Sequence, residues 1–550
     1  MSKMTTGRPS RVIRPPLRFT DGFEEEETPC EESVVEEESP SVTQGRSGRS
    51  NGAGGDAGTS RDRSRSPQHQ ERWKTEAEPD YGVPQKLRFN PRRTPGVQPP
   101  LNIGNPPPGE IFSHFFDAAA LLLLCQNTNK YSAKNLEKGR RFHWKEIQPE
   151  EMTKFIGMLL YMSVLDLPKI RDFWRTQSIF SVPFPTTAIT RDRFRAVLGN
   201  IHMSDPAQSE ENDAKKGTDE YDHLHRVRPL MEMIQINCKS IYQPRQHIAV
   251  DERMVGTKAR LGIKQYMKAK PTKWGLKFFV LAAANGYTLD FKLYTGKSKT
   301  ATGKGLSFDV VDGLMDRGYL GSGYIVYTDN FYTSPLLYRH LSQEGFGACG
   351  TYRDRDLLFV KWMDTREVSL CSTIHPVYSG DTVQRWQKTG DGPHHHISIP
   401  RPTTVTEYNR YMGGVDTSDQ MIGTNSVHRK TRRWPTTVFQ HLVDIAATNS
   451  FIIHKECASL QQVRPMTRQQ FQEELAAHLL GVDNRSGLQK TSYHHLPVPT
   501  SDEQTKSKRA TGGRRRCKLC QRSTAWQCED CAVGLCLQPD RNCFRQYHCK

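Results

Sequence analysis

Three aspartates lie in or directly after short apolar segments that are far apart in the 550-residue sequence. Asp251 lies in "QHIAVDERMVG", Asp329 ends "GYIVYTD", and Asp416 lies in "GGVDTSDQM". A carboxylate at the end of a buried strand needs cations, hydrogen bonds or water to offset its desolvation. Carboxylates from separate elements can hold two divalent cations about 3.5–4 Å apart, which stabilise the attacking and leaving oxygens of a phosphoryl displacement. Oxygen ligands suit Mg²⁺ or Mn²⁺.

Each of these aspartates also has a structural explanation. Asp251 can form an ion pair with a neighbouring arginine, and Asp329 can cap the turn that follows it. Asp416 or Thr417 can cap the N-terminus of a helix, with Asp419 in the first turn complementing the helix dipole. The spacing of the aspartates alone leaves both explanations open.

A basic region surrounds the first two aspartates. Between Arg253 and Lys304 there are twelve Lys or Arg residues and one acidic residue. Such a region can neutralise phosphates, and interleaved aromatic side chains can stack on unpaired bases. The alternative is a solvated lysine-rich face. The residues expected to contact nucleic acid here are Lys270, Lys273 and Trp274, together with the nearby aromatics Tyr266 and Tyr294.

Seven of the 13 cysteines lie after residue 516, in two C-x₂-C pairs followed by further Cys and His. In a reducing compartment this clustering favours two tetrahedral Zn²⁺ sites over disulfides. A cross-brace would place one zinc on the first and third pairs of ligands, Cys517, Cys520, Cys536 and Cys543. The other zinc would lie on Cys528, Cys531 and His548. The eighth ligand is open among Cys549, His494 and His495.

Composition bounds the partners and the compartment. The net charge of +17 and the pI of about 9.3 favour a polyanionic partner, nucleic acid before membrane. No apolar run approaches the roughly 20 residues of a transmembrane helix, and the N-terminus lacks the layout of a signal peptide. We therefore expect an intracellular protein without a membrane partner.

Composition and periodicity divide the chain into six segments. Residues 1–100 form a disordered tail, acidic and then Ser/Arg-rich, which lacks the apolar residues of a core. The remaining segments are helical (101–245), mixed sheet and helix (246–424), helical again (425–490), a basic linker (491–515) and the cysteine-rich domain (516–550).

Specific elements follow from local signals. One strand is expected before and one after an Asn285-Gly286 turn, and further strands are expected within "FVKWMDTREVSLCST". One helix is expected to be capped by Ser334 and closed by Gly345. Another is expected to start near Pro435, with its apolar stripe formed by Val438, Leu442, Ile445 and Ile452.

Several motifs together resemble the piggyBac family of DNA transposases and their host-domesticated relatives. They are "MLLYMSVLDLPKIRDFW", "TRDRFRAVLGNIHMSD", "IAVDERMVG", "KQYMKAKPTKWGLKFF", "YIVYTDNFYTS", "GTYR" and "YNRYMGGVDTSDQM…RKTRRWP". They occur in the order of the family and cover nearly everything after about residue 100.

The resemblance implies an α+β multidomain protein with a ribonuclease H-like core inserted between helical dimerisation and DNA-binding segments. It implies cut-and-paste transposition at TTAA sites, with nicking, hairpin formation and strand transfer, and transposon terminal repeats as the double-stranded DNA partner. Asp251, Asp329 and Asp416 correspond to the catalytic metal ligands (the DDD motif), and Asp419 to a further important acid. The insertion around 350–402 is shorter than in relatives.

The resemblance also implies where DNA binds. Arg432, Arg433 and Trp434 form the "RRWP" motif, whose tryptophan is needed for activity in the family; a core position is the alternative. In the family the cysteine-rich tail binds the terminal repeats, and the adjoining basic residues expected to assist are Arg514, Arg515 and Arg516. The basic clusters around residues 506–518 resemble a nuclear localisation signal, and joining two DNA ends implies a homodimer.

Three functions are compatible with these features. The first is a Mg²⁺- or Mn²⁺-dependent DNA transposase, favoured by the three aspartates. The second is a domesticated DNA- or chromatin-binding protein that no longer transposes, favoured by the shortened insertion. The third is a ubiquitin ligase built on the zinc cross-brace, which the motifs across the rest of the chain disfavour.

Overall fold

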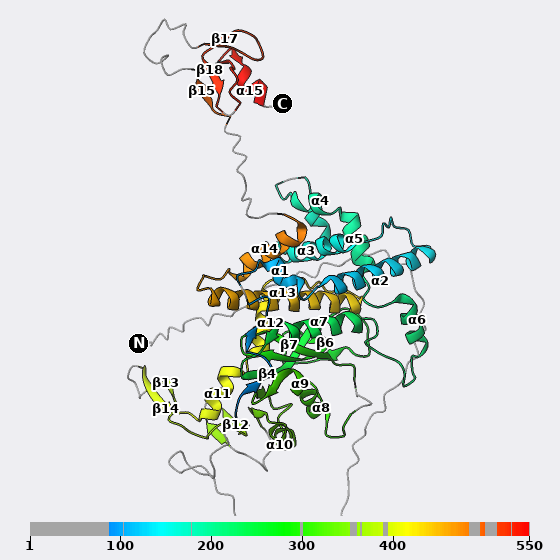
Figure 1. The fold of residues 1–550 in the computed structure, drawn as a ribbon, viewed down its shortest axis with the longest axis vertical. Helices are drawn as coiled ribbons and strands as arrows, with labels where there is room; N and C mark the ends of the chain where they lie inside the picture. Colours follow the sequence, from blue (N-terminus) through cyan, green and yellow to red (C-terminus); the bar gives the residue numbers. More distant parts are fainter. Residues whose placement is uncertain are drawn as a thin grey trace, which may run out of the picture. The chain divides into compact units, whose positions relative to one another are not determined.

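The computed structural model gives a fold in which a mixed β-sheet is covered by helices (Figure 1). It describes residues 87–102, 104–177, 179–296, 301–352, 360–363, 366–388, 394–482, 495–500, 514–529 and 531–548. The predicted acidic and Ser/Arg-rich tail up to residue 86 and most of the basic linker lie outside these ranges. Within them, no helix combines the length and apolar character needed to cross a membrane.

The central sheet has eight strands in the order β11-β12-β10-β9-β4-β6-β5, with β7 also paired to β6. Strand β9 is parallel to both β4 and β10, whereas β4, β6 and β7 are antiparallel neighbours. The strands are β4 His247–Gly256, β5 Gln265–Tyr266, β6 Trp274–Ala283, β7 Thr288–Leu293, β9 Ile325–Thr328, β10 Gly347–Thr351, β11 Val360–Met363 and β12 Glu367–Ser372. The mixed sheet confirms the α+β prediction.

The β6–β7 turn brings the sheet against helix α12 (Gly414–Thr424). Gly286 has φ +90°, which only glycine adopts without strain. A Cβ there would lie 2.5 Å from Met421 Cε, and one on Gly414 would lie 2.7 Å from the carbonyl oxygen of Ala283. These two glycines therefore let α12 lie directly on the end of the β6–β7 hairpin. The Asn285-Gly286 turn predicted from the sequence is present.

Helices flank the sheet on both sides. Helices α7 and α13 lie between the sheet and a further layer made of α2, α3 and α14, while α8, α9 and α10 lie on the opposite side (Figure 1). The helices before the sheet are α1 Pro108–Ser113, α2 Ala118–Glu137, α3 Pro149–Leu165, α4 Phe184–Ala188, α5 Arg191–Asn200, α6 Pro206–Ala214 and α7 Arg228–Ser240, with a 3₁₀ turn at Ile170–Trp174. Those within and after it are α8 Leu306–Asp312, α9 Arg317–Leu320, α10 Pro335–Gln343, α11 Thr403–Tyr411, α13 Trp434–Leu460 and α14 Arg468–Leu480.

Helix α13 is buried around nearly its whole circumference, beyond the single apolar stripe that the sequence predicts. Some of the buried polar side chains on its other faces have hydrogen-bond partners in neighbouring segments, whereas Thr436, His441 and Thr448 each keep a side-chain atom without one among the described residues. Asn449 accepts from the N–H of Thr288 and donates to its carbonyl, both at 2.9 Å, and thereby fixes β7 to the helix. Asp444 accepts from Ser426 Oγ at 2.6 Å and from the N–H of Val427 at 2.8 Å. Such fully satisfied buried groups specify one packing of helix on sheet.

The segment from residue 87 belongs to the fold, so the tail boundary predicted at residue 100 lies inside folded chain. Strands β1 (Asn90–Pro91) and β2 (Gly96–Val97) pair with β8 (Gly321–Ser322) and β3 (Tyr242–Gln243). The Phe89 ring packs edge-on against Tyr324 at 4.9 Å, and Arg93 donates to the backbone carbonyl of Tyr242 at 3.2 Å. The misleading signal was composition, because this Pro- and Arg-rich segment has little apolar content of its own.

Two smaller units complete the described chain. Strands β13 (Thr382–Lys388) and β14 (His394–Pro400) form a two-stranded ribbon. The cysteine-rich segment has its own small core around Cys517, Cys528, Leu535 and Cys536. Its elements are β15 Pro497–Pro499, β16 Arg515–Arg516, β17 Ser523–Thr524, β18 Trp526–Cys528, β19 Leu537–Gln538, β20 Arg541–Asn542 and α15 Cys543–His548.

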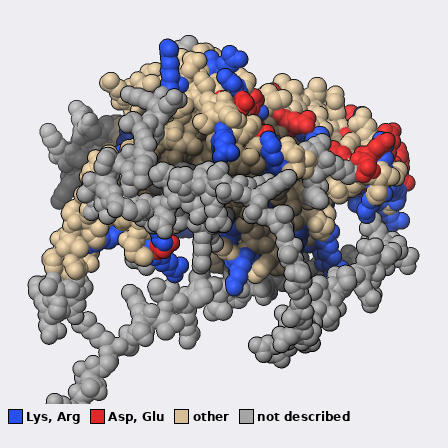
Figure 2. All heavy atoms as spheres, turned by 90° about the horizontal axis from the view of Figure 1, so that it is seen from below, with Lys and Arg blue, Asp and Glu red and all other residues tan. Residues whose placement is uncertain are grey.

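Charge is unevenly spread over the visible surface. On the face shown in Figure 2, Lys and Arg side chains are dispersed among uncharged residues, whereas Asp and Glu gather towards one side.

Candidate active site and metal centres

The parallel register of β4 and β9 brings two of the predicted carboxylates together. Val250 of β4 is the partner of Thr328, the last residue of β9. The next residue along each strand is an aspartate, Asp251 on β4 and Asp329 just past β9, so the two lie side by side on adjacent strands about 4.8 Å apart. Carboxylate oxygens of Asp251, Asp329 and Glu252 all lie within 4.8 Å of one another.

The turn after Asp329 is held by hydrogen bonds to the aspartate itself. Its Oδ1 accepts from the N–H of Phe331 at 2.9 Å, and its backbone carbonyl accepts from Thr333 Oγ1 at 2.8 Å. Thr333 also lies within hydrogen-bond distance of Thr328 and Tyr338, which anchors the turn to the strand and to α10. The capping explanation of Asp329 is thus part of the geometry, and it fixes the carboxylate beside Asp251.

Glu252 is the acidic residue that sequence reasoning missed. Its side chain is 4% exposed and accepts from Lys277 Nζ of β6 at 3.0 Å. Burial acts to raise the pKa of Glu252, but hydrogen bonding to Asp251 and the ammonium of Lys277 lower it overall. The ammonium lies over the rings of Phe279 and Phe331, 4.7 and 4.8 Å from their centroids. The lowered pKa favours the ionised form of Glu252 although its side chain is buried.

Asp251 has a different environment from its neighbour. Its Oδ1 accepts from the N–H of Glu252 at 2.7 Å, and its Oδ2 lies 3.3 Å from Lys270 Nζ. Burial raises the pKa of Asp251, and the charge of Lys270 partly opposes that rise. Burial likewise raises the pKa of Asp329. Both carboxylates are thus under-compensated, which is the condition under which a cation stabilises them most.

Asp416 lies in the first turn of α12 and is not one of the three carboxylates within 4.8 Å of one another. Its charge still reaches the site. Burial acts to lower the pKa of Lys270, but Asp251, Glu252 and Asp416 together raise it. The structure therefore brings Asp251 and Asp329 together with Glu252, while Asp416 lies near the same lysine.

Asp419 forms a different contact. It accepts from Nε of Arg253, whose side chain is 3% exposed and whose Nη2 donates to Ser418 Oγ at 2.8 Å. This pair ties α12 to β4 next to Asp251. Its geometry gives Asp419 a positioning role, and it replaces the ion pair between Asp251 and its neighbouring arginine that the sequence had left open.

We expect Asp419→Ala to lower the free energy of unfolding by about 1.5–3 kcal/mol, because it leaves a buried guanidinium without its charged acceptor. Chemical denaturation measures this change. Glu220→Ala is the matched control, since Glu220 pairs with Lys215 at 2.9 Å on an exposed surface, where solvent screens the pair and its loss should change stability little. Equal stability of the two variants would contradict the positioning role.

The three-carboxylate cluster fits a hard divalent cation. Its donors are all carboxylate oxygens, the ligands preferred by Mg²⁺ and Mn²⁺. Burial raises the pKa of two of its members, Asp251 and Asp329, and this rise is only partly opposed by the ammonium of Lys270 and by backbone N–H groups. Asp251 and Asp329 are the residues placed to hold such an ion, with Glu252 or Asp416 completing its charge balance.

The cysteine-rich segment contains two groups of four soft ligands. One is Cys517, Cys520, Cys536 and Cys543, and the other is His495, Cys528, Cys531 and His548. His495 Nδ1 lies 3.3 Å from Cys528 Sγ, and Cys520 Sγ lies 3.6 Å from Cys536 Sγ. Ligands at tetrahedral Zn²⁺ are separated by about 3.3–3.8 Å, so both groups fit zinc. Both groups have the composition that the cross-brace predicts, with His495 in the open position.

We expect His495→Ala to reduce the zinc content of the purified protein from about two ions to about one per chain, because the second site loses one of four ligands. The adjacent His494→Ala and the alternative Cys549→Ser serve as controls; both residues lie outside the described ranges. Elemental analysis or native mass spectrometry measures the content. Loss of zinc in Cys549→Ser with two ions kept in His495→Ala would assign the eighth ligand to Cys549.

The side chains expected to contact DNA differ in how far they are exposed to solvent and in whether they already bind other protein groups. Trp274 is 57% exposed and Tyr266 50%, and their rings lie 4.8 Å apart beside the exposed Lys273. Arg433 instead donates to the carbonyls of Leu198 and Ile201, each at 3.0 Å, at the end of α5.

The remaining expected DNA contacts lie at a helix start and in the cysteine-rich segment. Trp434 begins α13 and packs partly buried against the core. Arg514, Arg515 and Arg516 are exposed.

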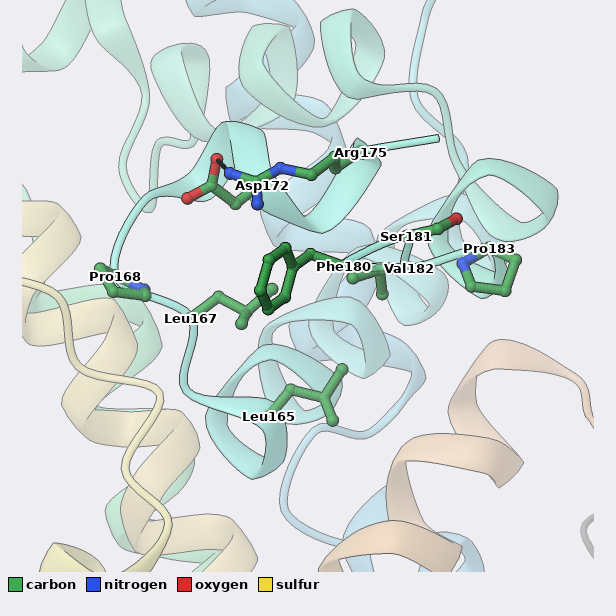
Figure 3. A pocket seen from close by; sticks show the side chains of 9 residues that line it. All are labelled: Leu165, Leu167, Pro168, Asp172, Arg175, Phe180, Ser181, Val182 and Pro183. Atoms are coloured by element: carbon green, nitrogen blue, oxygen red, sulfur yellow. Dashed lines mark hydrogen bonds and ion pairs between the residues drawn. The ribbon is translucent and has the colours of Figure 1, made fainter. Parts of the chain in front are cut away.

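A pocket of about 440 Å³ lies apart from the cluster of Asp251, Glu252 and Asp329 (Figure 3). The ring of Phe180 lies among its apolar side chains, and Asp172 and Arg175 form an ion pair of 2.9 Å at its margin. Its lining contains neither the acidic cluster nor the zinc ligands. The residues that line it are Leu165, Leu167, Pro168, Asp172, Arg175, Phe180, Ser181, Val182 and Pro183.

Comparison with known proteins places these features in a family context. A family model described as "Transposase IS4" matches residues 107–356 and 352–451. The human "PiggyBac transposable element-derived protein 3" is 23% identical over 492 residues, covering 80% of this chain and 76% of that protein. The human "PiggyBac transposable element-derived protein 2" is 24% identical over 400 residues, covering 65% of this chain and 63% of that protein.

A solved structure shares the fold. It is a "piggyBac transposase synaptic complex with hairpin DNA", determined by cryo-electron microscopy, and matches with a TM-score of 0.58 at 21% identity. The match covers 81% of this chain and 98% of that one. At this identity the likeness concerns the arrangement of the elements.

Proposed function

Because the chain belongs to the IS4 transposase family, in its piggyBac group, we propose that it cleaves and joins DNA strands with divalent cations. The finer proposal is cut-and-paste transposition at TTAA sites, by a homodimer acting in the nucleus, on a ribonuclease H-like core. The similar solved protein is bound to hairpin DNA, which supports DNA as the partner. The antiparallel β4, β6 and β7 with parallel β9 and β10 are compatible with that core.

The observation that carries the proposal is the register of β4 and β9, which sets Asp251 beside Asp329. Two aspartates on neighbouring strands, a third acid within 4.8 Å, and an oxygen-only donor set form a cluster suited to hard cations. When bound, such ions stabilise the attacking and leaving oxygens of a phosphoryl displacement. Structural caps and ion pairs alone do not require three carboxylates to converge.

The protein's own groups bind and orient the DNA. Lys273 and the exposed Trp274 and Tyr266 lie on the β5–β6 hairpin that also carries Lys270 next to Asp251. The ammonium of Lys273 can neutralise a backbone phosphate. The rings of Trp274 and Tyr266 offer stacking surfaces for unpaired bases such as those of a hairpin tip. The turn beginning at Asp329 is fixed by its internal hydrogen bonds, so the carboxylate would hold a cation without reorganising.

The cysteine-rich segment is proposed to bind the transposon ends. Two zinc sites would give this short segment most of its folding energy, since its core contains few large side chains. Arg514, Arg515 and Arg516 are exposed beside Cys517 and can contact phosphates. The same basic residues are part of the proposed nuclear localisation signal.

The test uses purified full-length protein and duplex DNA carrying its terminal repeats beside TTAA, with Mn²⁺, with Mg²⁺ or with a chelator. Denaturing gels are expected to show nicked and hairpin products that depend on the metal. Binding without cleavage, under conditions in which an active relative cuts its own ends, would refute the enzymatic proposal. It would support the second candidate, a domesticated DNA- or chromatin-binding protein, which the short insertion between β10 and α11 favours.

A further inference from the structure

Lys270 occupies the position in the acidic cluster where a cation is needed. Its Nζ lies 3.3 Å from Asp251 Oδ2, and its side chain is 23% exposed. It also interacts electrostatically with Glu252, Asp416 and Asp329. One ammonium is thus shared among four acids, including the one that lies outside the close cluster.

The second lysine of the site is held quite differently. Lys277 lies in β6, is 12% exposed, and is fixed by Glu252 and two aromatic rings. Lys270 lies in the short loop between β5 and β6, which is closed by a hydrogen bond of 2.8 Å from the N–H of Met267 to the carbonyl of Lys273. Within that loop Lys268 and Ala269 are exposed. Lys277 is held on several sides by buried groups, whereas Lys270 is in a loop, is more exposed and has a single ion-pair contact of 3.3 Å.

We propose that Lys270 is an internal competitor of the divalent cation, bound to Asp251 in the metal-free protein and released to a DNA phosphate when the cation binds. This proposal rests on the proposed metal site. In the metal-free protein the ammonium of Lys270 neutralises the carboxylate of Asp251. When the cation binds there, the displaced ammonium binds a DNA phosphate. Lys270 is therefore a positioning residue that couples metal loading to DNA binding, since two ligands that favour the same state strengthen each other.

The first test measures Mn²⁺ binding to zinc-loaded full-length protein by titration calorimetry without DNA. Lys270→Met is expected to bind Mn²⁺ about tenfold more tightly than the wild type, because the competing ammonium is gone. Lys270→Arg keeps the charge and should bind like the wild type. Lys268→Met, an exposed lysine two residues away, is the matched control and should also bind like the wild type. Asp251→Asn should lose the binding.

The second test measures the salt dependence of DNA binding. With Mn²⁺ present, Lys270→Met should show a log–log salt slope shallower than the wild type by about one, the signature of one lost phosphate contact. In chelator the slopes should coincide, because Lys270 is then held by Asp251. If Lys270→Met does not fold, Lys270→Gln replaces it with the same expectations.

Three results would overturn the proposal. They are unchanged or weaker Mn²⁺ binding in Lys270→Met, an equal gain in Lys268→Met, and salt slopes that do not respond to the metal. None of them depends on cleavage. Absence of Asp251-dependent Mn²⁺ binding in the wild type would instead remove the proposed metal site itself.

Discussion

Asp329→Asn is expected to reduce metal-dependent DNA cleavage by at least about 10³-fold while binding of the DNA ends is unchanged. The substitution keeps the side-chain shape and the oxygen that accepts from Phe331, but removes the charge that stabilises the cation. Losing several kcal/mol of transition-state charge stabilisation corresponds to a rate loss of this size. Gel-based cleavage rates and an equilibrium DNA-binding assay measure the two effects separately.

Asp192→Asn provides the matched control for this prediction. Asp192 is an exposed aspartate on α5 that pairs with Arg191 at 2.9 Å, so its substitution removes the same charge from the surface. Its cleavage rate should equal that of the wild type. Retained cleavage in Asp329→Asn would exclude a metal-ligand role for Asp329 and leave it as the cap of its turn.

Cys517→Ser is expected to unfold the zinc module and to abolish specific binding of terminal repeats. Cys517 is fully buried in the small core of that module, and its backbone surroundings lower the pKa of its thiol although burial acts in the opposite direction. A thiolate is the form that binds zinc. Structural zinc contributes on the order of 10 kcal/mol to folding in small modules, far more than a core of this size.

Zinc content, circular dichroism and binding to repeat DNA test this prediction together. The expected result is a loss of at least one of two zinc ions and of selectivity for the repeats. Cys125→Ser is the control, because Cys125 is buried in α2 and belongs to neither ligand group. A folded module with full selectivity in Cys517→Ser would show that the tail recognises DNA without zinc.

Much of the site could be predicted from local patterns. The apolar runs that lead to Asp251 and Asp329 identified two strands. In the structure these strands are parallel neighbours, which places the two aspartates side by side. The cysteine spacing identified seven of the eight ligands grouped in the structure, because C-x₂-C pairs are short-range features. The Asn285-Gly286 turn and the Ser334 cap followed from residue chemistry at single positions.

What the sequence did not predict depends on distant partners. Nothing in the local sequence distinguished Glu252, whose partner Lys277 is set diagonally across from it on β6 by the strand register. A lysine in the neighbouring strand was the available signal. The RRWP motif gave Arg433 as an expected DNA contact and did not reveal the three carbonyls at the end of α5 to which its guanidinium donates. His495 lies upstream of the cysteines, so their spacing left it as one of three candidates for the eighth ligand, and only the fold selects it.

The location of bound Mn²⁺ in crystals of the protein with its end DNA tests the central claim most directly. Anomalous scattering is expected to place at least one Mn²⁺ within about 2.0–2.3 Å of carboxylate oxygens of both Asp251 and Asp329, next to a DNA phosphate. Mn²⁺ bound only elsewhere, with Lys270 still on Asp251 and DNA in place, would contradict a metal-dependent site at the β4–β9 edge.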